Sequence, residues 1–385
     1  MLTIPNIYRH KNAKYLILLP LALFVISLFL SRYLVLDPTL VGGATIVLQS
    51  NSTIAPQQIA SSISSAIHGS SPTVEAGSGT IQITMDLNTS LAAAETRLNG
   101  VGSWESNYSN YFLNFTSYQI ALQADPSNST AASALNTSKA GMSKSLASMQ
   151  SSFSAEMSSL KPFGVLPNAS VNVSNVSSIL QAAQDAYSKA QIIYQNQVMS
   201  TVNSIVPYSS YSFEYIGPEL SSYFLSQLQS IIIIAFILVS IVVLFIFRSP
   251  IPSFAVVFGA ANDIIVAIGA MALFGIPLGI TSIGGLLMLI GYSIDTDVLT
   301  AIRILKRSGG TPEDRAYESM KTGLTMTATA IVAFAVLFIV SIIIYVPTYY
   351  EISSVVLFGL IADIFTTWFG NASIILWHKK RKEGI

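Results

Sequence analysis

The stretch Leu228–Phe247, LQSIIIIAFILVSIVVLFIF, decides the fold of this chain. It carries no charged side chain, and a helix needs about 20 apolar residues to cross the hydrocarbon core of a bilayer. A helix that is apolar on every side has no polar face to turn towards water. We therefore predict an integral membrane protein whose lipid-embedded part is all α-helical.

Five further stretches meet the same criterion, namely Tyr15–Leu36, Ser253–Phe274, Gly279–Leu305, Leu324–Val346 and Ile352–Trp377. Together with Leu228–Phe247 they predict a bundle of six transmembrane helices. A cleaved signal peptide is the alternative for the first stretch. Its apolar run resumes after Arg32, however, and no small-residue cleavage site follows. We expect this stretch to remain in the membrane as the first span.

The composition excludes several classes of function. Only 10% of the 385 residues are charged, against about 25% in an ordinary soluble domain, and the net charge is zero. A zero net charge gives no electrostatic footprint for nucleic acid. Cysteine is absent and the three histidines are scattered, so neither a disulfide nor a metal-ligand spacing is found. We expect no enzymatic activity, no cofactor and no metal.

Lysine and arginine fix the expected orientation, because they gather in cytoplasmic loops. Among the short loops and the termini, they occur in four segments, which are residues 1–14, the short loop at Arg248, the loop 306–323 and the tail 378–385. The alternate loops, Gly275–Leu278 and Pro347–Glu351, carry none. Six spans place all the basic segments on one side. We expect a multi-pass protein of the cytoplasmic membrane, with both termini inside and residues 37–227 outside.

The outside domain, residues 37–227, has an α+β base, which we expect to be ferredoxin-like. Its predicted elements are strands at Thr45–Leu48, Thr80–Met85 and Ser212–Ile216 and a helix at Pro56–Ile67. A helical insertion, about 88–207, separates the last two strands. The insertion carries three apolar stripes at helical spacing. The last two, separated by Pro162 and Pro167, indicate an antiparallel hairpin. They comprise Met142, Leu146, Met149, Phe153 and Leu160, and then Val176, Ile179, Ala183, Tyr187, Ala190 and Tyr194. Core packing is the simpler interpretation of the stripes, and a docking surface for a partner or an emerging polypeptide is the alternative.

Nine Asn-x-Ser/Thr motifs lie in the outside domain, where chance predicts about three or four. They begin at Asn51, Asn88, Asn107, Asn114, Asn128, Asn136, Asn168, Asn172 and Asn175. The excess indicates glycosylation, in agreement with the expected side of the membrane. Compositional accident is the alternative, because the segment is rich in serine and asparagine.

Ionisable residues inside the predicted spans are the most informative feature. These are Asp263, Asp295, Asp297 and Asp363, and each costs about 2.5–3.5 kcal/mol at a helix centre on insertion scales. Counted along their helices, Asp263, Asp295 and Asp363 lie about 15 Å deep, near the bilayer midplane. A carboxyl group from three helices at one level is typical of an ion or proton pathway. Structural hydrogen bonding by protonated aspartate is the alternative.

Small and polar residues indicate which helix faces meet. Gly291 shares a stripe with Asp295, whereas Asp297 lies about 200° away on nearly the opposite face. The predicted polar seam among the last four spans comprises Asn262, Thr325, Thr329, Thr366 and Thr367. Arg303, near the cytoplasmic end of its span, either pairs with a carboxylate or snorkels to the interface.

Four short motifs occur in the order and spacing of a known family, and they are Gly42-Gly43, Gly217-Pro218-Glu219-Leu220, Asn262-Asp263-Ile264 and Gly291-Tyr292-Ser293-Ile294. With the arrangement of spans, they resemble the SecF proteins of the SecD/SecF family, within the resistance-nodulation-division (RND) superfamily. The continuation Asp295-Thr296-Asp297 looks archaeal. Asn262 stands where the bacterial family has histidine, only Arg303 remains of its Asp-Arg pair, and the outside domain is far longer.

The resemblance implies a subunit that assists protein translocation through the Sec channel, coupled to the proton gradient. Its implied partners are a SecD homologue, the Sec translocon channel, unfolded secretory polypeptide and membrane lipid. Asp263 would carry the proton, with Asp295 as its partner and Arg303 as a modulator. Two alternatives stay open: an RND-type exporter of lipids or small molecules that acts as a dimer, and a surface adhesion or scaffold protein.

Overall fold

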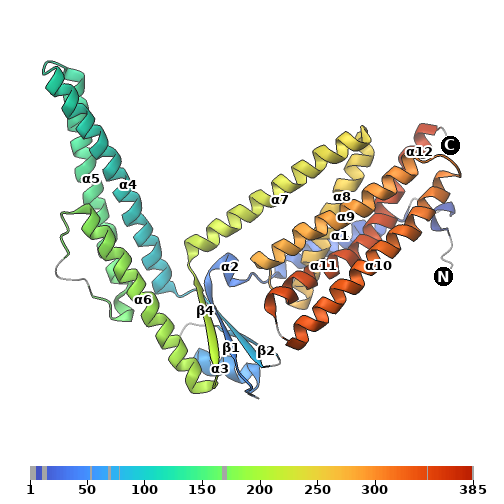
Figure 1. The fold of residues 1–385 in the computed structure, drawn as a ribbon, viewed down its shortest axis with the longest axis horizontal. Helices are drawn as coiled ribbons and strands as arrows, with labels where there is room; N and C mark the ends of the chain where they lie inside the picture. The colour runs from blue at the N-terminus through green and yellow to red at the C-terminus, as the bar shows by residue number, and fades with distance from the viewer. Residues whose placement is uncertain are drawn as a thin grey trace. The chain divides into compact units, whose positions relative to one another are not determined.

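The computed structural model describes residues 6–10, 15–52, 54–67, 71–77, 79–166, 171–344 and 346–383. Its Cα positions form two compact units. The membrane unit comprises Met1–Leu40, Ala76–Thr80 and Tyr223–Ile385, and the outer unit comprises Val41–Glu75 and Ile81–Ser222. The ribbon of Figure 1 follows the chain through both units.

Within the described residues, five helical segments are long and apolar enough to cross a membrane. They are α7 (Pro218–Phe247), α8 (Pro250–Phe274), α9 (Ile280–Lys306), α10 (Pro312–Ile344) and the continuous segment Pro347–Lys382. This last segment contains α11 (Pro347–Phe365), the π-helix η5 (Thr366–Asn371) and most of α12 (Ala372–Glu383). Four of the helices begin at proline, which fixes φ and lacks the N–H that a first helical turn leaves unpaired. The chain is a multi-pass membrane protein.

The first apolar stretch forms a shorter helix than its sequence predicted. Helix α1 (Leu18–Leu30) continues as a 3-10 turn, η3 (Ser31–Tyr33), and the backbone becomes extended at Leu34. The reason is a pairing with a residue distant in sequence: the Leu278 N–H donates to the Val35 carbonyl, and the Asp37 N–H donates to the Leu278 carbonyl, both at 2.9 Å. The described structure therefore contains five candidate spans and one shorter apolar helix, which packs against α8.

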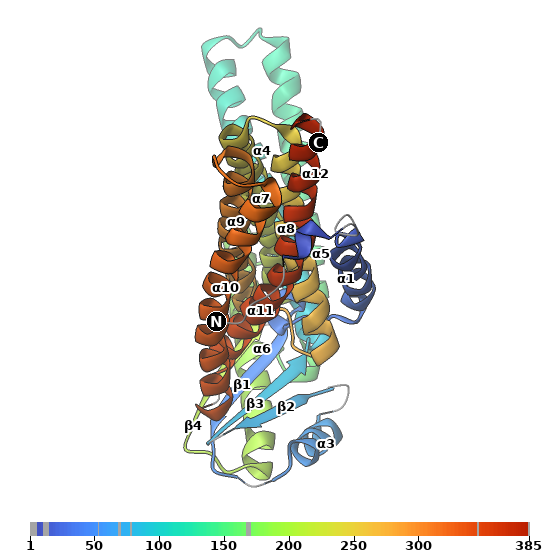
Figure 2. The same ribbon diagram turned by 90° about the vertical axis from the view of Figure 1, so that its right-hand side faces the viewer.

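The outer unit contains a four-stranded sheet in the order β2-β3-β1-β4. Its strands are β1 (Gly43–Gln49), β2 (Thr73–Gly77), β3 (Thr80–Asp86) and β4 (Ser210–Ile216), with α3 (Pro56–Ala66) between β1 and β2 along the chain. Strands β1 and β4 pair antiparallel, from Gly43 opposite Ile216 to Gln49 opposite Ser210. The sequence did not predict β2, because that strand is mostly exposed and lacks an apolar alternation. Figure 2 shows the sheet with α3 beside it.

Three long helices follow β3, and they are α4 (Thr89–Ala124), α5 (Ser129–Ser159) and α6 (Val176–Ile205). The antiparallel hairpin is formed by α4 and α5, one helix earlier than the sequence indicated (Figure 1). Glycine permits the close approach, because a β-carbon at Gly141 would overlap the ring of Tyr111. The apolar stripe of α6 is buried in the core with Ile46 of β1 and Ile83 of β3, as the simpler interpretation of the stripes predicted.

Candidate functional site

Three aspartates lie fully buried in the membrane unit, each on a different helix. They are Asp263 of α8, Asp297 of α9 and Asp363 of α11, all with 0% exposure. The hydroxyl of Thr367 in η5 joins two of them, since it lies 2.8 Å from Oδ1 of Asp297 and 2.7 Å from Oδ1 of Asp363. Asp263 lies within electrostatic reach of both other carboxyl groups. We call these three residues the carboxyl cluster.

Hydroxyl groups from neighbouring helices surround the carboxyl cluster. Ser293 of α9 donates to Oδ2 of Asp263 at 2.6 Å. Thr296 of α9 lies 3.2 Å from Oδ1 of Asp363, and Thr327 of α10 lies 3.3 Å from its Oδ2. A hydroxyl has one proton to donate and two lone pairs that accept, so each can pass a hydrogen bond in either direction. The carboxyl groups of the cluster are thus connected by hydroxyl groups that can relay a proton.

Several oxygens of the site have no hydrogen-bond partner among the described residues. They are Oδ1 of Asp263, Oδ2 of Asp297 and the side-chain oxygens of Asn262 and Asn371. The ion pairs in the described parts of the chain involve Arg9, Arg307 and Lys380, and none of them reaches the cluster. Buried charge without a partner is strongly unfavourable. Three ionised carboxylates would therefore be strongly unfavourable in this arrangement unless a cation were bound, and protonation of a carboxyl group removes its charge.

A π-helix supplies one wall of the site. The wide turn of η5 interrupts the last candidate span, and such turns are frequently found at functional sites. On it, Thr366 accepts a hydrogen bond from Nδ2 of Asn262 at 2.6 Å, and Asn371 donates to the main-chain oxygen of Asp297 at 3.4 Å. The π-helix thereby directs Thr366, Thr367 and Asn371 towards α8 and α9.

The structure brings Asp297 into the cluster, not Asp295, which we expected to be the partner of Asp263. Asp295 is exposed and lines a cavity of about 430 Å³ between α9 and α10. Gly284 and Gly291, which lie on the same face of α9 as Asp295, do not mark an interior face, since a β-carbon at either position would meet open space. The expectation that the two aspartates lie on nearly opposite faces agrees with this arrangement.

The cavity beside Asp295 reaches the hydroxyl groups of the site. Its lining includes Thr296 and Thr327, two of the three threonines that contact Asp363, together with Thr329 and Tyr292. Thr329 and Thr325, both expected in the polar seam, instead bond to carbonyl oxygens within α10. A single threonine hydroxyl, that of Thr296 or Thr327, therefore separates the cavity from Asp363 of the carboxyl cluster.

Arg303 lies outside the cluster. Its Nη1 donates to Oγ1 of Thr322 at 2.8 Å and to the main-chain oxygen of Glu318 at 3.4 Å, both on α10. The residues that the sequence analysis missed are Ser293, Thr296, Thr327 and Asn371. A signal was present for two of them, because Ser293, Thr296, Asp297 and Thr300 recur every three or four residues on one face of α9.

Three of the four family-motif glycines lie at the ends of strands in the outer unit. Gly42 and Gly43 lead into β1 with φ of 86° and 149°, values that favour glycine. Gly217 joins β4 to α7, and a β-carbon there would overlap the carboxylate of Glu95 on α4. Gly291, by contrast, is open on its side-chain face.

Part of the excess of Asn-x-Ser/Thr motifs has a structural explanation. Asn88, Asn128 and Asn175 are helix N-caps whose side chains accept backbone N–H bonds at the starts of α4, α5 and α6. Asparagine is favoured at such positions for this reason alone. The remaining motif asparagines are exposed, namely Asn51, Asn107, Asn114, Asn136 and Asn172, except that Asn168 lies outside the described residues.

A bundle of long apolar helices that encloses carboxyl groups and hydroxyls defines a multi-span membrane protein with an ionisable interior. Residues 196–381 match the family model described as "Protein export membrane protein SecD/SecF, C-terminal". Over slightly less than half of its length, the chain is thus similar to the SecD/SecF family of protein-export membrane proteins. This is a family of transport components, which agrees with our expectation that the chain is not an enzyme.

Curated relatives are similar to this chain over part of their length. The protein-export membrane protein SecF of Methanothermobacter thermautotrophicus is 46% identical over 169 residues, which cover 43% of this chain and 59% of the relative. The SecF of Methanocaldococcus jannaschii is 43% identical over 172 residues, covering 44% and 61%. The chain thus spans about six tenths of these relatives. The crystal structure of SecDF, a translocon-associated membrane protein from Thermus thermophilus, covers 97% of this chain with a TM-score of 0.48 and 14% identity.

Proposed function

We propose that this protein is a SecF subunit that assists Sec-dependent translocation of polypeptides across the cytoplasmic membrane. The proposed partners are a SecD homologue, the Sec translocon channel and the unfolded secretory polypeptide. The family match supports this role, since residues 196–381 contain the whole carboxyl cluster. In this proposal the shorter helix α1 is a sixth membrane segment, both termini lie in the cytoplasm and the outer unit faces outside.

We further propose that translocation is coupled to proton movement through the carboxyl cluster. The observation that carries this proposal is Thr367, whose single hydroxyl lies within 2.8 Å of two buried carboxyl groups. When one carboxyl is protonated it can donate to Thr367 while Thr367 donates to the other, so a proton is relayed without a charge crossing open space. The cluster contains no basic side chain that would fix its charge.

The cavity beside Asp295 supplies the access in this mechanism. Water in the cavity would exchange protons with Asp295 at its rim, and Thr296 and Thr327 would pass them to Asp363. From Asp363 the proton passes through Thr367 to Asp297. Asp263, which lies within electrostatic reach of both, is the carboxyl group proposed to hold the proton. Protonation neutralises a buried carboxyl and removes its repulsion towards its neighbours, which permits the helices to move relative to one another.

The test measures export in membrane vesicles that contain the Sec channel and the SecD homologue, with and without an imposed proton gradient. We expect Asp363→Asn to abolish the acceleration of export by the gradient while export without a gradient continues. The matched control is Thr325→Val, which changes an exposed residue of α10 and should respond to the gradient as wild type does. Normal acceleration in Asp363→Asn, at equal abundance, would refute coupling through the cluster.

A further inference from the structure

The segment that precedes the first apolar helix packs against the membrane unit through a short 3-10 turn, η1 (Ile7–Arg9). At its centre, Tyr8 is only 2% exposed and lies in a core with residues of α10 and α12. The Tyr8 hydroxyl donates a hydrogen bond of 2.8 Å to the main-chain oxygen of Trp368. A tyrosine distant in sequence thus binds the backbone of the π-helix η5.

The main-chain oxygen of Trp368 is suited to this bond. In η5 the N–H of Ala372 reaches back five residues to Thr367, where an α-helix would reach back four. A return from five-residue to four-residue spacing leaves one carbonyl without a donor inside the helix. Tyr8 supplies a donor from outside, and a buried carbonyl requires one.

Trp368 has a second contact, through its indole ring. Trp368 is 2% exposed, and a β-carbon at Gly323 of α10 would overlap its ring. Trp368 is therefore fixed at two points: the backbone of α10 packs against its ring, and the Tyr8 hydroxyl binds its main-chain oxygen. Its neighbours in η5, Thr367 and Asn371, are the residues that contact Asp297 and Asp363.

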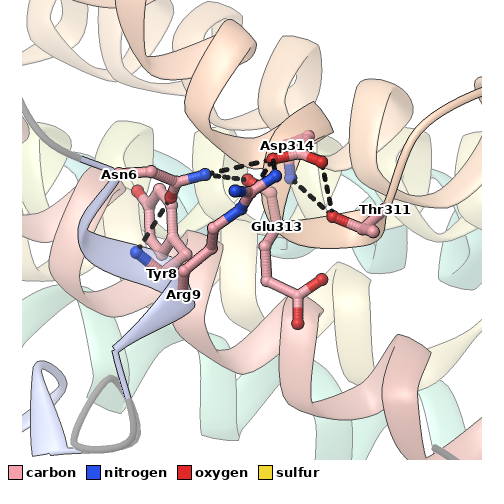
Figure 3. Close-up of polar contacts among 6 residues, drawn as sticks. All are labelled: Asn6, Tyr8, Arg9, Thr311, Glu313 and Asp314. Atoms are coloured by element: carbon pink, nitrogen blue, oxygen red, sulfur yellow. Dashed lines mark hydrogen bonds and ion pairs between the residues drawn. The ribbon is translucent and has the colours of Figure 1, made fainter.

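Polar contacts at the start of α10 hold the segment in place, as Figure 3 shows. Arg9 forms an ion pair of 2.8 Å with Asp314, and Nδ2 of Asn6 lies 3.3 Å from the same carboxylate. Thr311 donates to the other oxygen of Asp314 at 2.8 Å. Because the Arg9 pair is largely exposed, it guides the segment more than it stabilises it. The buried bond from Tyr8 is the contact that bears on η5.

We propose that Tyr8 is a positioning residue for the carboxyl cluster and that residues 6–10 form a latch on the π-helix. While the latch is closed, the wide turn stays at residues 366–371 and directs Thr367 and Asn371 to the carboxyl groups. Loss of the extra residue from the turn would rotate the following residues by about 100° and withdraw these contacts. The functional meaning of the latch rests on the proposed proton coupling, whereas its structural effect does not.

The test is hydrogen exchange, measured by mass spectrometry on the full chain in lipid nanodiscs, with Tyr8→Phe against wild type. The variant keeps the ring and removes the hydroxyl. We expect amides in Thr366–Asn371 to exchange about fivefold faster, the factor for one hydrogen bond of ordinary strength. The control is Tyr33→Phe, since Tyr33 is 65% exposed. Exchange equal to wild type in Tyr8→Phe would overturn the proposal.

A second measurement separates positioning from mere stability. We expect the infrared band of the protonated carboxyl groups, assigned with Asp363→Asn, to change frequency in Tyr8→Phe and to be unchanged in Tyr33→Phe. An unchanged band in Tyr8→Phe would overturn the positioning role. If Tyr8→Phe does not accumulate, Tyr8→Met, which fills the same core position without a hydroxyl, must give the same acceleration and band shift.

Failure of this proposal and failure of proton coupling are distinguishable, because neither measurement involves export. Normal export by Asp363→Asn would end the coupling, while a shifted band in Tyr8→Phe would still support the latch. Unchanged exchange in Tyr8→Phe would end the latch, while a gradient-insensitive Asp363→Asn would still support the coupling.

Discussion

The carboxylate of Asp297 lies against the bare backbone of Gly259, so closely that a β-carbon at position 259 would overlap its Oδ2 atom. The absence of a side chain on α8 thus makes the room that Asp297 occupies. Both residues are buried, so neither can move aside into lipid. The contact shows that the face of α9 that packs against α8 is the face of Asp297 and not that of Asp295.

Gly259→Ala is expected to displace Asp297 and to destabilise the membrane unit by about 1–3 kcal/mol, as overpacking of a filled core does. The matched control is Gly284→Ala, which points into open space. Because alanine favours helix over glycine, the control should be neutral or more stable by up to about 1 kcal/mol. Thermal unfolding in detergent measures both, and equal stability of the two variants would contradict the packing described here.

Thr367→Val is expected to remove the relay between Asp297 and Asp363, because valine has nearly the same shape and no hydroxyl. Gradient-driven export should fall at least about tenfold, the ratio for a lost hydrogen bond to a charged group. Thr367→Ser should retain activity, since it keeps the hydroxyl. The measurement is the export rate in vesicles under a fixed proton gradient, and full activity of Thr367→Val would exclude the relay.

Glu156 of α5 predicts a pH-dependent stability of the outer unit. Burial raises the pKa of its carboxyl from 4.5 to about 8, and neither of its oxygens has a partner among the described residues. The folded state therefore holds a proton that the unfolded state releases above pH 4.5. Stability should be constant below this pH, fall as pH rises towards about 8, and then level off.

The measurement is the Tm of the full chain between about pH 4 and 9, followed by circular dichroism, with the pH range set by the linkage relation. Glu156→Gln should flatten the decline, because glutamine does not titrate. Glu105→Gln on α4 is the control and should keep the wild-type decline, since Glu156 is intact. A decline of the same size in Glu156→Gln would assign the effect to another group.

The junction between β4 and α7 offers a further test. Tyr187 of α6 donates to Oε2 of Glu95 at 2.8 Å, and the Glu95 carboxylate lies over Gly217. Burial, together with nearby Glu219, raises the pKa of Glu95, and the Tyr187 bond opposes that rise. We expect Gly217→Ala to push Glu95 away and to make a second change, Tyr187→Phe, nearly harmless.

A double-mutant cycle of Gly217→Ala and Tyr187→Phe measures this dependence through thermal unfolding. The coupling free energy should be about 0.5–3 kcal/mol, as for groups that share a network. Additive effects of the two substitutions would mean that Glu95 does not connect them. In that case the effect of Gly217→Ala on the free energy of unfolding would come from the backbone conformation at residue 217 alone.

Apolar length was enough to predict the long helices, because lipid leaves a backbone few alternatives. The first span shows the limit, since pairing of Val35 and Asp37 with Leu278 involves residues far away in sequence. Strand β2 was missed because an exposed strand has no apolar alternation. These errors share a cause: the deciding contact is not local.

The site followed the same rule. Helical geometry predicts that Asp295 and Asp297 lie on nearly opposite faces, but it does not say which face is interior. Glycines at 284 and 291 suggested one answer, although a glycine also occurs where nothing approaches it. The π-helix contacts residues far away in sequence, as Trp368 contacts Tyr8, and the spacing of apolar residues in the sequence does not predict it.

The hairpin of α4 and α5 is free to vary in length. No residue between 105 and 145 belongs to the core that α6 and the sheet build, so this part is held only by its partner helix. Removing or adding seven residues in each helix, nearly two turns, would keep the same faces together. The hairpin of α4 and α5 can therefore lengthen by paired insertions, or shorten by paired deletions, during evolution. For protein engineering it is a spacer whose length can be set in steps of about 10 Å.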